Sequence, residues 1–431
     1  MNKHLRQILR SVHLVFLEWQ TLIRVQIARW DHRRALERVR RKARSGVPLR
    51  VLFIDSEVAK WKAQSLYDQM KSDSRYEPII GVSVRDGKAF SRASDAEIDK
   101  GIVEAERYFT DKGCKCVRIY DVATRTFLDL RQFAPDLVFY EQVYYDYGLH
   151  HVRHVCKYAL TCYIPYYVPN FGDMNQDTRK VSHRFYNYYF TLNEDWSETY
   201  RKANSRLYTS CKYIATGHPM LDQLNCVTSV PATGEKTIIY APHWTIFHPK
   251  SGVTIPHSTF LETGREILSY AQTHKEFQWI FKPHPALFRH LVKCGIWTQH
   301  ETDEYLGEWE KIGRVCMDGN YCPLFLKSSA MITDCASFLT EYGATGKPII
   351  RLMCPHEVLR PISFMEKLYA TYYEVRTIPE MLSTFAEVLE KGNDYKKIER
   401  QREVENARLS NSCAAKNIMD FLDRCLWEGM D

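Results

Sequence analysis

The sequence lacks the short motifs that mark several common enzyme classes. It contains no Gly-x-x-x-x-Gly-Lys-Ser/Thr loop, no Gly-x-Ser-x-Gly elbow and no His-Glu-x-x-His helix. These absences argue against a P-loop nucleotidase, an α/β hydrolase and a zinc peptidase of the usual kinds. No internal repeat or low-complexity segment is visible either. The chemistry of this chain must therefore be inferred from its strands and from the loops that follow them.

Paired cysteines are also missing. The chain has 13 cysteines, an odd number, with no Cys-x-x-Cys pair and no zinc-like spacing of cysteine and histidine. Reduced thiols in a cytosolic protein are the simplest explanation. The crowded group of His150, His151 and His154 near Cys156 resembles a polar helix start more than a metal site. We therefore expect no metal and no cofactor.

The sequence has no apolar run long enough to cross a bilayer and no recognisable cleavable signal. Glu18, Gln20, Arg24 and Gln26 interrupt the best candidate, which lies near the start of the chain. These observations predict a cytoplasmic protein without a membrane-spanning helix.

What is present fits a chain of two α/β domains. At 431 residues the chain is long for a single hydrophobic core. The apolar fraction of 45% is ordinary, whereas the aromatic share of 13% is high, partly because of 27 tyrosines. This composition is sufficient to bury two substantial cores.

Positive charge is concentrated at the N-terminus. The first 50 residues carry a net charge of +10, which leaves −3 for the rest of a chain whose total is +7. Apolar residues recur there at spacings of three or four, as on one face of a helix. They are Leu5, Leu9, Val12, Phe16, Trp19 and Ile23. A basic cluster follows at residues 33–44.

A helix of this kind is typical of a segment that lies on an anionic membrane surface, so we expect residues 1–45 to bind one. The alternative is a helix packed on the body of the protein or on a partner helix. Nucleic acid is not expected as a partner, because no nucleic-acid-reading module follows the basic stretch.

Strands and helices alternate through the rest of the chain, as in two Rossmann-like halves. Residues 49–54 and 135–140 read as buried strands of the first half, and Gly217-His-Pro219 turns the chain into the second. The predicted segments are a basic amphipathic helical segment at 1–47, a first Rossmann-like domain at 48–220, a second at 221–380 and a helical tail at 381–431.

Three strands of the second half end in polar loops. His243 and Trp244 follow a β-branched strand that stops at Pro242, and Lys282 and His284 follow an aromatic strand. The third strand precedes Asp334 and Ser337, at the start of a short helix whose free N–H groups suit a phosphate. In an open parallel sheet, ligands bind at the carboxyl ends of the strands, so these loops should line one crevice.

These loops resemble motifs of the CDP-glycerol glycerophosphotransferases, which build teichoic-acid-like polymers and related surface polysaccharides. The resemblance is ordered and covers roughly residues 216–350. The matching segments are Thr216-Gly-His-Pro-Met-Leu-Asp222, Tyr240-Ala-Pro-His-Trp-Thr245, Lys282-Pro-His-Pro285, Thr333-Asp-Cys-Ala-Ser337 and the pair Glu341-Tyr342.

The resemblance implies a GT-B type α/β fold, with two Rossmann-like domains facing a central crevice, the donor on the second and the acceptor on the first. It implies transfer of glycerol phosphate, or a similar polyol phosphate, from CDP-glycerol or another nucleotide-activated donor to a glycan or lipid-linked acceptor, with release of CMP. His284 would contact the reacting phosphate and His243 would act as the base. The donor-binding residues would be Lys282, Thr333, Asp334, Ser337 and Glu341.

The sequence departs from the family pattern at several positions. The family's first domain carries a Trp-His-Gly triplet whose histidine is implicated as the base, and the comparable stretch here, residues 161–169, has no histidine. His243 and Thr245 replace the usual threonine and arginine, and Cys335 and Ala336 replace a tyrosine and a serine. Two alternatives therefore stay open: a GT-B glycosyltransferase that uses a nucleotide sugar, and a non-catalytic relative that binds polymer.

Overall fold

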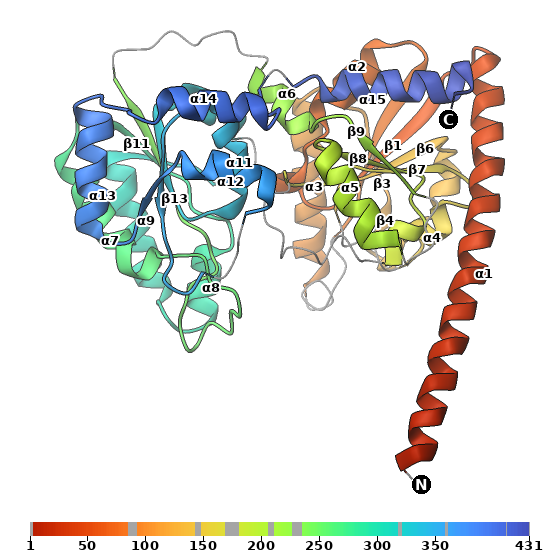
Figure 1. Cartoon of the computed structure of the whole chain (residues 1–431), viewed down its shortest axis with the longest axis horizontal. Coiled ribbons are helices and arrows are strands. Elements are labelled where there is room, and N and C mark those ends of the chain that lie inside the picture. Colours follow the sequence, from red (N-terminus) through yellow and green to blue (C-terminus); the bar gives the residue numbers. More distant parts are fainter. Residues whose placement is uncertain are drawn as a thin grey trace. The chain divides into compact units, whose positions relative to one another are not determined.

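The computed structural model describes residues 3–84, 93–142, 148–168, 181–205, 211–225, 235–317, 321–357, 361–410 and 412–430. The chain forms two compact units (Figure 1). Unit 1 comprises Met1–Tyr166, Asn175–Met220 and Cys413–Asp431, and unit 2 comprises Tyr167–Met174 and Leu221–Ser412. The chain passes from unit 1 to unit 2 between Met220 and Leu221, but the units differ from the predicted ranges, since Tyr167–Met174 belongs to unit 2 and Cys413–Asp431 to unit 1.

Unit 1 is built on a seven-stranded parallel sheet with the order β3-β2-β1-β6-β7-β8-β9. Its strands are short runs of apolar residues because both faces of the sheet are covered, which leaves no polar face to alternate with. They are β1 (Leu49–Asp55), β2 (Tyr76–Val82), β3 (Cys116–Arg118), β6 (Leu137–Tyr140), β7 (Leu160–Tyr163), β8 (Tyr188–Thr191) and β9 (Lys212–Ala215). A small antiparallel pair joins β4 (Tyr120–Asp121) to β5 (Thr126–Phe127).

The helices of unit 1 cover this sheet and share its core. Apolar residues from α1, α2, α3 and α15 pack with those of the strands in one cluster. The helices are α1 (Lys3–Arg44), α2 (Gln64–Ser72), α3 (Asp95–Asp111), α4 (Val152–Val155), α5 (Glu194–Asn204) and α15 (Ala414–Asp423), while α6 (Pro219–Asn225) spans the division between the units.

Unit 2 contains a six-stranded parallel sheet with the order β12-β11-β10-β13-β14-β15. If the six strands are numbered 1 to 6 along the chain, with β10 as strand 1, their order in the sheet is 3-2-1-4-5-6. This is the doubly wound arrangement, whose switch point lies between strands 1 and 4. The strands are β10 (Thr237–Ala241), β11 (Gln278–Phe281), β12 (Gly313–Val315), β13 (Ala330–Thr333), β14 (Ile349–Leu352) and β15 (Tyr373–Val375). The switch point therefore falls between β10 and β13.

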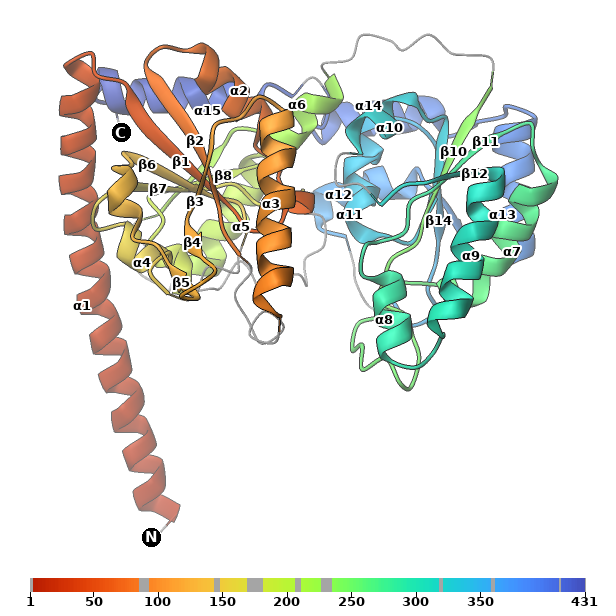
Figure 2. The ribbon, with the colours of Figure 1, turned by 180° about the vertical axis from the view of Figure 1, so that it is seen from behind.

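Helices lie on both sides of this second sheet. Figures 1 and 2 show α7, α9 and α13 on one side and α11 and α12 on the other. The unit 2 helices are α7 (Phe260–Thr273), α8 (Leu287–Lys293), α9 (Gln299–Ile312), α10 (Cys322–Lys327), α11 (Ala336–Glu341), α12 (Ser363–Ala370), α13 (Ile378–Phe385) and α14 (Lys397–Asn406).

The N-terminal helix α1 has two apolar faces rather than the single stripe expected. Its second half packs on unit 1 and is continuous with that unit's core, through Ala35, Leu36, Val39 and Ala43. Trp19, Ile23, Ile27 and Trp30 are exposed. At about 3.6 residues per turn these residues fall roughly opposite the packed face. The side chains of Leu5, Leu9, Val12 and Phe16 lie outside the described residues.

The C-terminal tail does not form one segment as predicted. Helix α14 belongs to unit 2, whereas α15 belongs to unit 1 and buries Ile418 and Leu422 against α2 and the sheet. Among the residues described, no helix is both long and apolar enough to span a bilayer.

Candidate functional site

The polar loops predicted after three strands lie next to one another in unit 2. Strands β11, β10 and β13 are neighbours and run parallel, so their carboxyl ends share one edge at the switch point. Backbone pairing continues past the strands, because Lys282 N–H donates to Tyr240 O at 2.8 Å and His284 N–H donates to Pro242 O at 3.0 Å. These bonds fix the two histidine-bearing loops side by side.

Asp334 is buried and joins the end of β13 to the loop that follows β10. Its Oδ1 accepts the backbone N–H of His243 at 2.6 Å, and its Oδ2 accepts the backbone N–H of Thr259 at 2.7 Å. Burial raises the pKa of Asp334 to about 7, although the backbone N–H groups of Thr259 and His243 oppose the shift. The carboxylate thus contacts backbone donors and shapes the site around them.

The imidazoles of His243 and His284 lie close together and are both partly exposed, with ring centroids 5.0 Å apart. Nδ1 of His243 accepts the N–H of Thr245 at 3.3 Å and lies 2.8 Å from the Thr245 hydroxyl. Nδ1 of His284 accepts the N–H of Ala286 at 3.1 Å. Since each Nδ1 is an acceptor, the proton of each neutral ring belongs on Nε2.

This protonation pattern bears on what the two rings can do. Burial, followed by the nearby His284 and His257, lowers the pKa of His243 well below its usual value, so the ring is neutral at physiological pH. A neutral ring with its proton on Nε2 donates a hydrogen bond and does not accept a proton there. The arrangement favours donation to an anionic group over the base function expected of His243.

A third histidine, His257, lies near this pair and was not identified from the sequence. Its ring centroid is 5.7 Å from that of His243, and its backbone N–H donates to the Thr245 hydroxyl at 3.2 Å. Burial, and secondarily the charge of Arg351, lower its pKa to about 4. His257 precedes the start of α7 and follows no strand, so the strand-end pattern could not reveal it.

Lys282 and Glu341 belong to a second, aromatic group of contacts. The Lys282 ammonium lies 5.1 Å from the ring centroid of Tyr321 and 6.0 Å from that of Phe338. The Tyr321 hydroxyl in turn donates to Glu341 Oε2. Lys282 and Glu341 are both buried. The lysine therefore packs against the ring of Tyr321, which precedes α10, and that of Phe338 in α11.

Thr333 and Ser337 occupy different environments. The Thr333 hydroxyl is fully buried and donates to Ala241 O at 2.6 Å, while accepting the N–H of Cys335 at 2.9 Å, so it joins β13 to β10. Ser337 is partly exposed and lies 3.4 Å from the Cys335 sulfur. Helix α11 is only six residues long, and its first position is Ala336.

The contacts thus divide five of the seven predicted residues into two groups. His243, His284 and Asp334 form one group, and Lys282 and Glu341 form the other through Tyr321.

Within the described ranges, no group of three or more His, Cys, Asp and Glu side chains is arranged to hold a metal ion. His151 instead caps α4, since its Nδ1 accepts the N–H of Arg153 at 3.0 Å.

No protein-family model matches the sequence, and no curated protein matches it. Solved structures do match in their fold. A wall teichoic acid polymerase, TagF, in a variant soaked with CDPG, superposes with a TM-score of 0.54 at 14% sequence identity, covering 100% of this chain and 99% of that chain.

Two further structures give similar superpositions. A UDP-N-acetylglucosamine 2-epimerase described as putative, from Listeria monocytogenes, matches with a TM-score of 0.55 at 12% identity, covering 89% of this chain and 98% of its own. The S. aureus MnaA–UDP structure matches with a TM-score of 0.54 at 11% sequence identity, covering 89% of this chain and 99% of its own. These likenesses confirm the GT-B type α/β fold and the structural resemblance to a CDP-glycerol glycerophosphotransferase at the level of the fold.

Proposed function

We propose that this protein is a transferase that moves glycerol phosphate, or a similar polyol phosphate, from a CDP-linked donor to a hydroxyl of a glycan or lipid-linked acceptor. The acceptor hydroxyl oxygen forms a bond to the phosphorus that carries the polyol, the bridging P–O bond to CMP breaks, and the hydroxyl proton is released to water. The observation that carries the proposal is the 5.0 Å approach of the His243 and His284 rings at the switch point of unit 2, where Asp334 holds the His243 backbone. The fold shared with TagF and the ordered motifs support the same reaction.

The two imidazoles suit a reaction that depends on alignment and charge neutralisation. Each presents an Nε2–H group, and His243 Nε2 makes no hydrogen bond to a described residue, so it is available to a phosphate oxygen. We assign His284 and His243 as donors to the donor's phosphates. Asp334 positions the His243 loop, because its carboxylate accepts the backbone N–H groups of His243 and Thr259.

The remaining predicted residues have supporting roles in this proposal. Lys282 offsets charge on the leaving nucleotide, Ser337 offers a hydroxyl to the diphosphate, and Glu341 is the candidate for the ribose hydroxyls. Thr333 acts indirectly, by joining β13 to β10 beneath the site. We place the enzyme at the inner face of the membrane, held there by the basic N-terminal helix.

The test is a pair of histidine substitutions assayed for CMP release from CDP-glycerol. His284→Ala should lower turnover by about 100-fold or more, because a donor to the reacting phosphate is lost. His300→Ala is the matched control, since His300 is an exposed residue of α9 whose nearest charged contact is Glu304. Full turnover by a folded His284→Ala protein would reject the proposed role.

A glycosyltransferase that uses a nucleotide sugar is the second candidate, because the fold is also shared with a UDP-bound structure and with a structure described as a UDP-N-acetylglucosamine 2-epimerase. In that case the acceptor attacks the anomeric carbon of a nucleotide sugar and a nucleoside diphosphate, or CMP from a CMP-sugar, leaves. A donor screen that identifies the transferred group and the released nucleotide separates the two reactions. The missing first-domain histidine keeps a non-catalytic, polymer-binding protein as a third candidate, which binding of CDP, UDP or CMP in calorimetry would argue against.

A further inference from the structure

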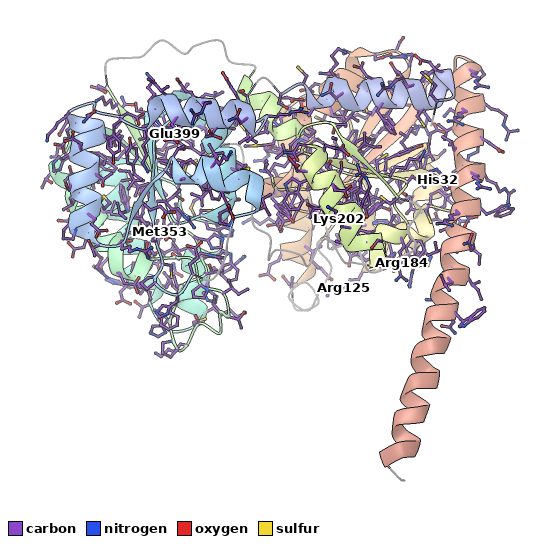
Figure 3. All side chains as sticks on the ribbon, viewed as in Figure 1. His32, Arg125, Arg184, Lys202, Met353 and Glu399 are labelled. Carbon is purple, nitrogen blue, oxygen red and sulfur yellow. The ribbon has the colours of Figure 1, made fainter. Side chains whose placement is uncertain are left out.

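A cavity of about 340 Å³ lies in unit 1, far along the chain from the candidate site. Its walls come from α1, from the segment that contains α4, and from Arg184 and Phe185 before β8. Arg184 is labelled in Figure 3, together with His32 of α1. Since all of these residues belong to unit 1, the cavity is a property of that unit alone.

The cavity walls are strongly cationic. Arg24, Arg153, Lys157 and Arg184 line it, and Asp31 is the single acidic residue that does. His151 and His154 also line it, but burial and the charge of Arg153 lower the pKa of both rings, which favours their neutral forms. Four cations therefore face one carboxylate, a balance that attracts an anion.

Arg184 shows that this charge is not fully compensated within the protein. Its Nε is buried and makes no hydrogen bond to any residue that the structure describes. A guanidinium does not deprotonate in proteins, so a buried and unpaired Nε–H is costly unless an external acceptor binds it. A phosphate is a fitting acceptor, because guanidinium groups bind phosphate oxygens in a two-pronged geometry.

An apolar surface adjoins the same cavity. Ile27 lines the cavity and also belongs to the exposed stripe of Trp19, Ile23, Ile27 and Trp30 on α1, whose members are 51–65% exposed. Tryptophan and isoleucine on such a stripe are suited to the boundary between lipid headgroups and acyl chains. A small soluble anion has no apolar part to contact this stripe, whereas a phospholipid has acyl chains that can.

We propose that the cavity binds the headgroup phosphate of an anionic phospholipid, while the stripe on α1 lies among the acyl chains. This inference builds on the membrane association proposed above, and it does not depend on the transfer reaction. The stripe would supply membrane affinity, and the cavity would select for phosphate-bearing, negatively charged lipid.

The experiment measures binding of the full-length protein to a short-chain phosphatidylglycerol kept below its aggregation concentration. The double variant Arg153→Ala/Lys157→Ala should bind it about tenfold or more weakly, because two charge-assisted contacts are lost. The control is Lys100→Ala/Lys202→Ala, which removes the same charge from two exposed sites of unit 1 outside the cavity. This control should bind as the unchanged protein does.

Three further measurements complete the test. Short-chain phosphatidylcholine, which has no net charge, should bind weakly, and Ile23→Ser should weaken binding to phosphatidylglycerol vesicles. Equal losses in the two double variants would overturn the proposal in favour of nonspecific attraction. Inorganic phosphate that binds as tightly as the short-chain lipid would overturn it in favour of a soluble anion. Because no donor is present, a failed transfer assay leaves this result unaffected.

Discussion

At the scale of single residues, a buried aspartate lies at the carboxyl end of a central strand in each sheet. Asp334 is one, and Asp55 is its counterpart at the end of β1 in unit 1. Asp55 Oδ1 accepts from Gln142 Nε2 at 3.0 Å, but its Oδ2 has no hydrogen-bond partner in the described part of the chain. Burial, and then the nearby charge of Glu57, raise the pKa of Asp55 to about 7.

This raised pKa predicts a pH-dependent stability. Between the ordinary pKa of 3.8 and about 7, Asp55 is protonated in the folded chain and ionised in the unfolded chain. The unfolded state then binds fewer protons, so this residue's contribution to the free energy of unfolding falls as pH rises. Asp55→Asn cannot ionise and should gain stability relative to the unchanged protein, because each tenfold difference in proton affinity between the two states corresponds to about 1.4 kcal/mol.

Denaturant unfolding of both proteins at about pH 5 and about pH 8 measures this difference, since the free energies of unfolding are obtained directly. The advantage of Asp55→Asn should be larger at the higher pH. Asp111→Asn serves as the control, because Asp111 is an exposed residue at the end of α3. An advantage that does not change with pH would contradict the argument.

At the scale of elements, the short helix after β13 depends on a glycine that the sequence pattern alone does not explain. Gly343 follows α11, and a Cβ at this position would lie 2.2 Å from the Tyr372 hydroxyl. That hydroxyl donates to Leu339 O within α11 and is buried, so it cannot easily move aside. Close approach of α11 to Tyr372 therefore requires glycine.

Two glycine substitutions with opposite expected signs test this requirement. Gly343→Ala should destabilise unit 2 by about 1–3 kcal/mol through overpacking against Tyr372. Gly307→Ala, inside α9, meets no atom within 4 Å and should stabilise the protein by about 0.5–1 kcal/mol, because alanine restricts the unfolded chain and favours helix. Thermal unfolding measures both. Equal effects of the two substitutions would disprove the packing argument.

At the scale of the whole molecule, each unit has its own sheet and its own core, so each should respond to damage locally. Helix α15 offers the sharpest test. It follows α14 of unit 2 in the chain, yet Leu422 is fully buried in the core of unit 1.

Leu422→Ala should therefore cost about 2–5 kcal/mol in unit 1, since it creates a cavity there. In hydrogen exchange, peptides from β1 and α2 should lose protection, while peptides from β10 and β13 should keep it. Loss of protection confined to unit 2 would show that α15 belongs to the other core.

The sequence by itself predicted the alternation of strands and helices and the three polar loops of the candidate site. It could do so because buried parallel strands are short apolar runs, and because the ends of neighbouring parallel strands must meet at one edge. That reasoning placed His243, Lys282, His284 and Asp334 at the strand ends, and the family resemblance supplied their expected roles.

Only the tertiary structure decided which groups act on one another. His257 reaches the site because its backbone binds Thr245, and Asp334 then fixes the adjoining Thr259; neither contact leaves a periodic signal. The two faces of α1 and the return of α15 to unit 1 depend on which sheet offers an uncovered apolar surface. An apolar helical face predicts that the helix packs against something. Which surface it packs against is decided only in the folded chain.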